Sequence, residues 1–352
     1  MPVNEPRLLA LAQMHHLEPV LAHYLPAATL TAATTAQLQA AARRQRIRAT
    51  VMTHAFLTLQ AQLDRAGVPV IPLKGIVQAH TLYPGPALRY FDDIDLLVPG
   101  EAAPIAESVL QEAGYAPHPR ALRPDWHHLI PYTHPQHGAT VEIHTGLVRR
   151  HPAGWPVADI WARARRGELA GQSAWLLANE DALIFTALHA RHHLFDKLNF
   201  VVETVWLAQR VTNTAELLRR VDAAGARAAL AHLLWLADQW GLATDLPVVK
   251  AAWLPGQTAR RVAGWTDLTP PPDDLRYGAL PKGLEILLQD NSGEMWRTGR
   301  ELVWPSAEFV NTGYAATTSR PLNALNRLWR RTRLAARQLW ALRRRASDKR
   351  KR

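Results

Sequence analysis

The chain has 352 residues, enough for about two domains of ordinary size, and 48% of them are hydrophobic, which predicts a folded protein with a sizeable core. It has no cysteine, so disulfides, thiolate metal sites and a cysteine nucleophile are excluded. The formal net charge of +11 resides in the tail: residues 326–352 hold 12 of the 41 basic residues and one of the 30 acidic ones, which leaves 29 of each elsewhere.

The N-terminal residues carry neither the basic start nor the uninterrupted apolar stretch of a signal peptide. The sequence also has no run of about 18 apolar residues, so a membrane span is not expected. These features predict a cytoplasmic protein.

Apolar periodicity predicts a helical start, a short stretch that mixes strands and helices, and a second helical part. In the mixed stretch we expect strands at 68–73, 91–98, 127–134 and 139–148, helices at 75–83 and 101–115, and a loop at 84–89. From about residue 155 the pattern is mostly helical, with helices expected at 179–196, 199–211, 214–225 and 226–241.

This order predicts an α+β protein with a small sheet. We expect four parts: an N-terminal helical region at 1–66, a core at 67–150, a helical domain at 151–320 and a basic amphipathic tail at 321–352.

Three acids adjoin large aliphatic residues in the stretch "RYFDDIDLLV" at 89–98. Because residues two apart share a face of a strand, Asp93 and Asp95 point one way, while Ile94 and the alternate residues after it point into the sheet. Two carboxylates on one face repel each other unless a divalent cation lies between them, and oxygen ligands suit Mg²⁺. The alternative is that these acids are solvated at an exposed strand edge or cap a turn, and Asp92 is a bystander under either interpretation.

Lys74 and Gly75 stand between an expected strand and an expected helix. A glycine at this position lets backbone N–H groups approach a phosphate, the start of the helix favours negative charge, and the lysine neutralises it. A helix-start glycine is also common in ordinary turns, so the pair alone does not decide between the two.

Glu142 lies on the strand expected at 139–148, and His144 follows on the same face. An isolated glutamate on a strand usually faces solvent. If this strand lies beside that of Asp93, however, Glu142 completes a cluster of three carboxylates, an arrangement that two-metal phosphoryl-transfer sites use.

Four motifs in order, "PVIPLKG", "LRYFDDIDLLV", "VEIHTGL" and "NEDALIFTALHARHH", resemble an uncharacterised bacterial nucleotidyltransferase family of the polymerase-β-like superfamily. The resemblance extends from about Ala41 to Arg210 and implies a small mixed-sheet nucleotidyltransferase core, preceded by helices and followed by a helical domain. Two features depart from the superfamily pattern: Lys-Gly replaces its usual Gly-Ser turn, and 17 residues separate Gly75 from Asp93.

The resemblance implies a role for each matching residue. Asp93, Asp95 and Glu142 would be the catalytic, metal-binding acids, and the nucleotide-binding residues would be Lys74, Gly75 and Arg89. Because His144 shares the strand face of Glu142, we expect it among the nucleotide-binding residues as well. The implied cofactor is Mg²⁺, as two ions, with Mn²⁺ as an alternative.

The implied reaction moves NMP from an NTP such as ATP to a hydroxyl acceptor with release of pyrophosphate. The acceptor can be a small molecule, a protein or an RNA end. The contrasting hypothesis is a catalytically inactive module of the same fold that senses nucleotide or binds a partner.

Two further features suggest other partners. His189 and His193 are one helical turn apart, which is compatible with zinc, but the glutamate of the metalloprotease helix motif is absent, and packing or substrate-facing roles are favoured. The tail at 326–352 predicts a cationic amphipathic helix that packs on the body, binds RNA or docks on an anionic membrane.

Overall fold

The structure is a computed structural model that describes residues 3–118, 126–149, 151–193 and 195–242, with isolated positions beyond (246, 289–290, 293 and 295–297). The expectations for the tail at 321–352 and for most of the chain after residue 242 lie outside the described residues. Within them, no helix combines the length and apolarity needed to cross a bilayer.

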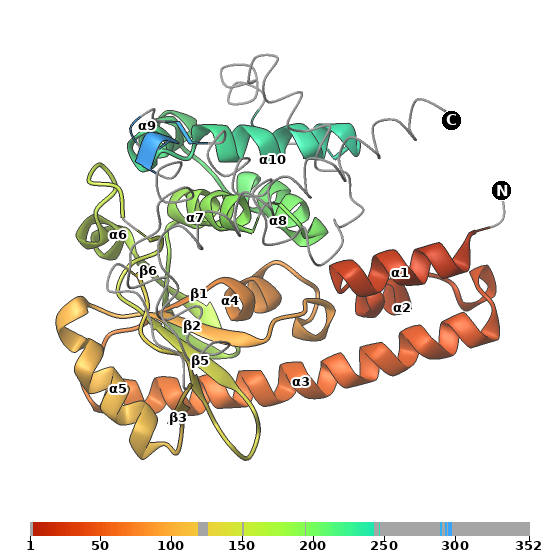
Figure 1. Ribbon diagram of the computed structural model, residues 1–352, viewed down its shortest axis with the longest axis horizontal. Helices are drawn as coiled ribbons and strands as arrows, with labels where there is room; N and C mark the ends of the chain where they lie inside the picture. The colour runs from red at the N-terminus through yellow and green to blue at the C-terminus, as the bar shows by residue number, and fades with distance from the viewer. Residues whose placement is uncertain are drawn as a thin grey trace, which may run out of the picture.

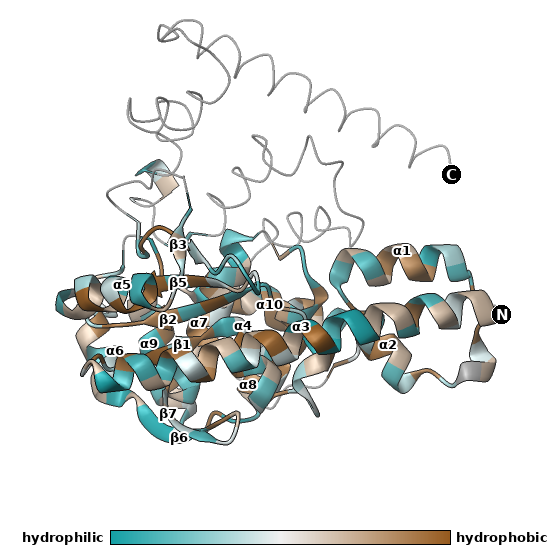
Figure 2. Cartoon of the chain, turned by 90° about the horizontal axis from the view of Figure 1, so that it is seen from below, coloured by the Kyte–Doolittle hydropathy of each residue, from teal (hydrophilic) through white to brown (hydrophobic). Residues whose placement is uncertain are grey.

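Three helices form the N-terminal part: α1 (Glu5–His15), α2 (Glu18–Tyr24) and α3 (Ala32–Arg65). The Thr31 hydroxyl caps α3 by accepting a hydrogen bond from the Thr34 N–H, and Glu5 on α1 accepts one from the Thr31 N–H at 2.8 Å. The helix α3 passes along the sheet and continues beyond it, where α1 and α2 lie beside its first half (Figures 1 and 2). These helices confirm the helical start that the apolar periodicity of the sequence predicts.

The central sheet has five strands in the order β1-β2-β5-β4-β3. Their bounds are β1 (Ile71–Leu73), β2 (Asp93–Leu97), β3 (Ala116–Pro117), β4 (Tyr132–Thr133) and β5 (Thr140–His144). The pair β2–β5 is parallel and the other three pairs are antiparallel. The chain crosses between β2 and β5 through α5 (Ala103–Glu112), as a parallel pair requires. This mixed sheet confirms the predicted α+β class.

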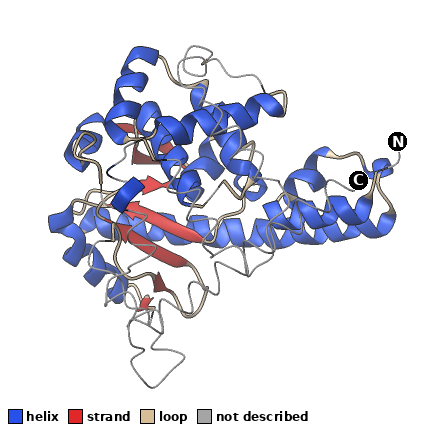
Figure 3. Ribbon diagram, turned by 45° about the horizontal axis from the view of Figure 1, so that its top comes forward, coloured by secondary structure: helices blue, strands red, loops and turns tan. Residues whose placement is uncertain are grey.

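Both faces of the sheet are buried, which explains the apolar runs in β2 and β5. Ile94 and Leu96 belong to one core cluster with Phe56 of α3. Leu97 points the other way, into a second cluster that contains Leu188 of α7. The strands therefore lie between α3 on one side and the later helices on the other (Figure 3).

The later helices are α6 (Val157–Arg163), α7 (Asn179–His192), α8 (Leu198–Ala208), α9 (Thr214–Ala224) and α10 (Arg227–Gln239). They confirm the expected helical region up to the end of the continuous described chain. One short helix, α4 (Lys74–Thr81), follows β1 directly and lies between the sheet and these helices (Figure 1).

One element differs from the expected helical pattern after residue 155. Residues Arg165–Leu169 and Gln172–Leu176 form an antiparallel hairpin, β6–β7. Its two turn residues, Ala170 and Gly171, have φ values of 52° and 79°, the left-handed backbone of a tight hairpin turn. Alternate burial in β7 shows why a strand is favoured here, because Ala174 and Leu176 enter the core that lies on the α3 side of the sheet.

Two further strands differ from the expectation. The strand expected at 127–134 is reduced to β4 and a single bridge between His128 and His144. The short strand β3 was not expected, and it pairs only with β4.

Candidate nucleotide and metal site

The register of β2 and β5 brings two of the predicted acids together. Asp95 is paired with Glu142, and Asp93 with Thr140. Paired residues of parallel strands project from the same face, so the carboxylates of Asp95 and Glu142 are neighbours. Asp93 is two residues before Asp95 and shares that face. The sequence-predicted acids therefore lie on one face of the sheet, toward α7.

Asp95 is fully buried and lies at the centre of the cluster. Its Oδ1 accepts a hydrogen bond from Lys74 Nζ at 3.1 Å and lies 2.7 Å from His144 Nε2. Its Oδ2 is buried and has no hydrogen-bond partner among the described residues. Burial alone would raise the pKa of Asp95, but the Lys74 ammonium and the bond to His144 outweigh it and lower the pKa well below its usual value.

The other two acids differ in charge state. The adjacent Asp95 carboxylate, and then burial, raise the pKa of Asp93 to about 7. Burial opposes ionisation of Glu142, yet a bond from His144 lowers its pKa overall. Asp95 and Glu142 are thus anionic at neutral pH, while Asp93 titrates near it. Together the three acids form a site that attracts positive charge.

The donor atoms fit a divalent cation. Ligand atoms of Asp95, Glu142 and His144 all lie within 4.8 Å of one another, and this is the one such group in the described part of the chain. The two carboxylates suit Mg²⁺ or Mn²⁺, and the unpartnered Oδ2 of Asp95 is an available ligand atom. His144 was predicted to be a nucleotide-binding residue, and its Nε2 lies 2.7 Å from Asp95 Oδ1 and 3.5 Å from Glu142 Oε2.

In the turn before α4, Lys74 and Gly75 have backbone and packing roles that differ from those expected. Lys74, not the glycine, has the left-handed backbone, with a φ of 45°. Gly75 is buried, and a Cβ on it would come within 2.5 Å of the Phe91 Cβ and 3.0 Å of Arg89 Nη1. The glycine therefore permits close packing between α4 and the residues that lead into β2, a reason that sequence alone did not reveal.

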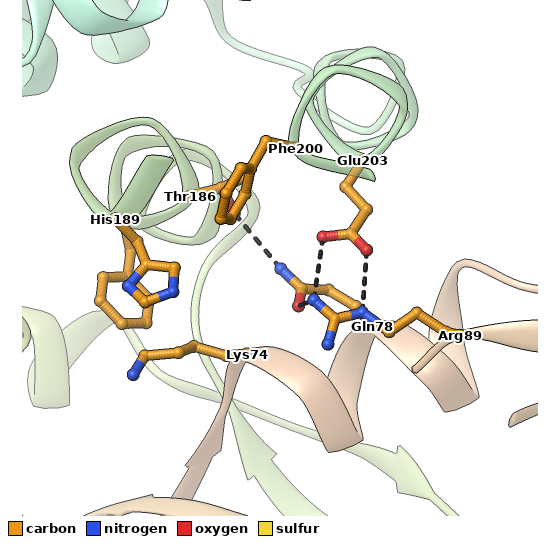
Figure 4. Close-up of a pocket in the computed structure, with 8 residues that line it drawn as sticks. Lys74, Gln78, Arg89, Thr186, His189, Phe200 and Glu203 are labelled. Atoms are coloured by element: carbon orange, nitrogen blue, oxygen red, sulfur yellow. Dashed lines mark hydrogen bonds and ion pairs between the residues drawn. The ribbon is translucent and has the colours of Figure 1, made fainter. Parts of the chain in front are cut away.

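Arg89 makes its contacts toward α8. Its Nε donates to Glu203 Oε1 at 2.9 Å, its Nη2 to Gln78 Oε1 at 3.1 Å and its Nη1 to the Tyr90 carbonyl at 2.9 Å (Figure 4). Glu203 is fully buried and also accepts a bond from the Tyr83 hydroxyl at 3.0 Å. Sequence reasoning missed Glu203, because no local pattern connects it with Arg89, 114 residues away. It also missed Gln78, which is only 11 residues from Arg89.

A small pocket lies beside this ion pair. Its lining residues are Lys74, Gln78, Arg89, Phe185, Thr186, His189, Phe200 and Glu203. Lys74 and His189 are on the same side of it, and Gln78 bonds the Thr186 hydroxyl at 3.4 Å (Figure 4). The pocket therefore adjoins the acid cluster through Lys74.

The histidine pair proposed for zinc lies on and just after α7. The rings of His189 and His193 are 4.4 Å apart. Burial, and then the Lys74 charge, lower the pKa of His189 well below its usual value. Among the described residues these two belong to no group of three potential metal ligands.

The mixed sheet, with acids paired across its parallel strands, has the features of a nucleotidyltransferase core. Residues 2–241 match a family described as "Uncharacterised nucleotidyltransferase". The chain belongs to this family. A comparison with curated proteins finds no match.

Solved structures show distant likenesses. One is ANT(2")-Ia in complex with adenylyl-2"-tobramycin, at 16% identity and a TM-score of 0.36, covering 49% of this chain and 95% of that one. Another is an antigenic nucleotidyltransferase-like protein from Paracoccidioides brasiliensis, at 17% identity and a TM-score of 0.36, covering 58% and 92%.

Proposed function

We propose that the protein is a Mg²⁺-dependent enzyme that transfers NMP from an NTP to a hydroxyl acceptor and releases pyrophosphate. The observation that supports this most is the pairing of Asp95 with Glu142 on parallel strands, with Asp93 on the same face and the Lys74 ammonium 3.1 Å from Asp95. Family membership supports the transferase class.

In this proposal Asp93, Asp95 and Glu142 would hold the cation, as one or two ions, while His144, with its Nε2 2.7 Å from Asp95 Oδ1, would orient that carboxylate. When bound, Mg²⁺ or Mn²⁺ supplies charge stabilisation at the α-phosphate and a more acidic acceptor hydroxyl. The buried, unpartnered Asp95 Oδ2 supports this assignment, since an anionic oxygen without a donor is costly to bury.

The chain's own residues position the nucleotide. Lys74 offers an ammonium to the β- and γ-phosphates, and the uncapped first turn of α4, which includes Gly75, offers backbone N–H groups. Arg89 helps to position the turn at Lys74 and Gly75, because its Nη1 lies 3.0 Å from where a Cβ on Gly75 would be. Direct contact of Arg89 with the nucleotide would require the bond to Glu203 to break.

In the transfer step, the acceptor oxygen forms a bond to the α-phosphorus as the bond to the pyrophosphate oxygen breaks in line. The acceptor proton passes to Glu142, the most solvent-accessible acid of the metal-compatible group, with a side chain 20% exposed. The Lys74 ammonium stabilises the negative charge on the leaving pyrophosphate. The acceptor, whether a small molecule, a protein or RNA, and the preferred NTP stay open.

The test is label transfer. The full chain is incubated with each α-³²P-NTP, Mg²⁺ or Mn²⁺, and pools of metabolites, proteins and RNA. We expect label in one acceptor pool, and its loss by more than about 100-fold in Asp95→Asn. The matched control is Asp92→Asn, an exposed acid that precedes β2, which should keep activity.

The inactive-module alternative has a different outcome. It predicts no label in any pool while NTP binding persists. Absence of both label and cation-dependent NTP binding would remove the proposed function altogether.

A further inference from the structure

The cation already present at the acid cluster is a side chain. Lys74 Nζ lies 3.1 Å from Asp95 Oδ1, and the two side chains are 15% and 0% exposed. The charges of Asp95, Asp93 and Glu142 all act on this ammonium. Lys74 thus partly neutralises the three acids that are proposed to hold the metal.

The ammonium and a divalent ion would both be bound by the carboxylate of Asp95. Asp95 Oδ1 is within hydrogen-bond distance of both Lys74 and His144, and only Oδ2 is unpartnered in the described part of the chain. A divalent ion on this carboxylate would lie a few ångströms from a positive charge in a buried setting where screening is weak. The ion therefore binds well only if the ammonium moves.

The surroundings of Lys74 provide a second position. Its Nζ lies 5.8 Å from the centre of the Phe185 ring, and its side chain forms part of the wall of the pocket beside α7. The long side chain can rotate toward this side while the backbone of the turn stays fixed. Phosphate oxygens near the start of α4 would supply the charge that draws it there.

We propose that Lys74 occupies the cation position on Asp95 until a nucleotide draws it away, so that the divalent ion binds tightly only together with the nucleotide. The inference rests on the proposed function, because it needs the triphosphate to bind beside α4. In this proposal Lys74 binds phosphate when the nucleotide is present and weakens metal binding when it is absent.

The experiment measures Mn²⁺ binding to the full chain from the electron paramagnetic resonance signal of the free ion. Titrations are run without nucleotide and with each of the four α,β-methylene NTP analogues. For the wild type we expect weak Mn²⁺ binding alone and binding at least about tenfold tighter with the accepted analogue.

Lys74→Met, a neutral side chain of similar length, should bind Mn²⁺ without nucleotide about tenfold more tightly than the wild type. The gain should vanish in Lys74→Met/Asp95→Asn, which distinguishes the site from other metal-binding groups. The matched control is Lys197→Met, which removes the same charge from a lysine that donates to the Met14 carbonyl.

Equal Mn²⁺ affinity in the wild type with and without an analogue that binds overturns the inference, even if the Lys74 variant does not fold. An Asp95-dependent Mn²⁺ affinity that is unchanged or weaker in Lys74→Met overturns it as well, while the proposed function stands. No Mn²⁺ binding in any protein under any condition overturns both.

Discussion

A single missing methyl group at Gly75 determines how closely α4 approaches the strand of the acids. A Cβ there would come within 2.5 Å of the Phe91 Cβ, and this carbon is attached to the backbone, so it cannot rotate away. The residue that sequence reasoning assigned to phosphate binding therefore also has a packing role.

We expect Gly75→Ala to lower the free energy of unfolding by about 1–3 kcal/mol, because overpacking forces a shift of Phe91 or Arg89. The measurement is urea denaturation. Gly85→Ala is the matched control, since a Cβ at Gly85 meets nothing within 4 Å. Equal stability of the two variants would show that Gly75 is not closely packed.

The titration of Asp93 gives a pH signature in the metal-free protein. Its pKa is raised to about 7, first by the Asp95 charge and then by burial. The folded state therefore keeps a proton that the unfolded state releases above about pH 4. By linkage, the contribution of Asp93 to the free energy of unfolding falls as the pH rises through this window.

Replacing Asp93 by Asn removes this fall. We expect the stability of Asp93→Asn relative to the wild type, measured by denaturation in EDTA, to increase between pH 5 and pH 8 by more than about 1 kcal/mol. Titrating groups that do not interact with Asp93 contribute equally in both proteins and cancel. Asp92→Asn should show a smaller increase, because the Asp92 charge is only a minor cause of the raised pKa of Asp93. A flat difference for Asp93→Asn would contradict the raised pKa.

At the scale of elements, Arg89 and Glu203 join the segment before β2 to the helix α8. The side chains are 11% and 0% exposed, and Gln78 and Tyr83 complete the network. Because both charges are buried, removing one partner leaves the other without compensation.

We expect Glu203→Gln to reduce the free energy of unfolding by about 3–5 kcal/mol, and Arg89→Gln in the same chain to recover part of the loss. A double-mutant cycle by urea denaturation measures the coupling. Asp159→Asn is the control, as Asp159 is 60% exposed and 3.8 Å from Arg163, and it should change stability by less than about 1 kcal/mol. Additive effects of the two buried substitutions would exclude the pairing.

Elements with strong local patterns were predictable, and contacts between distant elements were not. The period-2 pattern of β2 separated Asp93 and Asp95 from the apolar face, and Glu142 and His144 were correctly placed on one face of β5. The hairpin β6–β7 was missed because β6 is rich in charged residues and the turn begins with alanine rather than the usual Asn or Gly.

The limits within the site have the same cause. The bond of His144 to Asp95 depends on the parallel register of β2 with β5, which alternation alone does not define. The left-handed backbone of Lys74 had no signal either, since lysine rarely adopts it.

For the whole molecule, charge is divided unequally along the sequence. Residues 326–352 carry the entire formal net charge of +11, and the rest of the chain is neutral. Attraction to phosphate-bearing surfaces is therefore expected to depend on the tail.

We expect a chain truncated after Leu325 to elute from a heparin column at much lower salt than the full chain, with label transfer unchanged. A full-length variant in which the tail's Arg and Lys residues are replaced by Gln should behave like the truncated chain. Retention of the truncated chain at the original salt concentration would assign the attraction to the body instead.

The end of α1 contacts two segments that are far apart in the sequence, the residues before β2 and the start of α8. The His16 ring stacks on Tyr90 at 4.2 Å, and Lys197 at the start of α8 donates to the Met14 carbonyl at 2.7 Å. Any movement that separates α8 from the lead into β2 must break one of these contacts. Residues 14–16 thus link the segment before β2 to the start of α8 and limit how far the sheet and the later helices can separate when substrates enter.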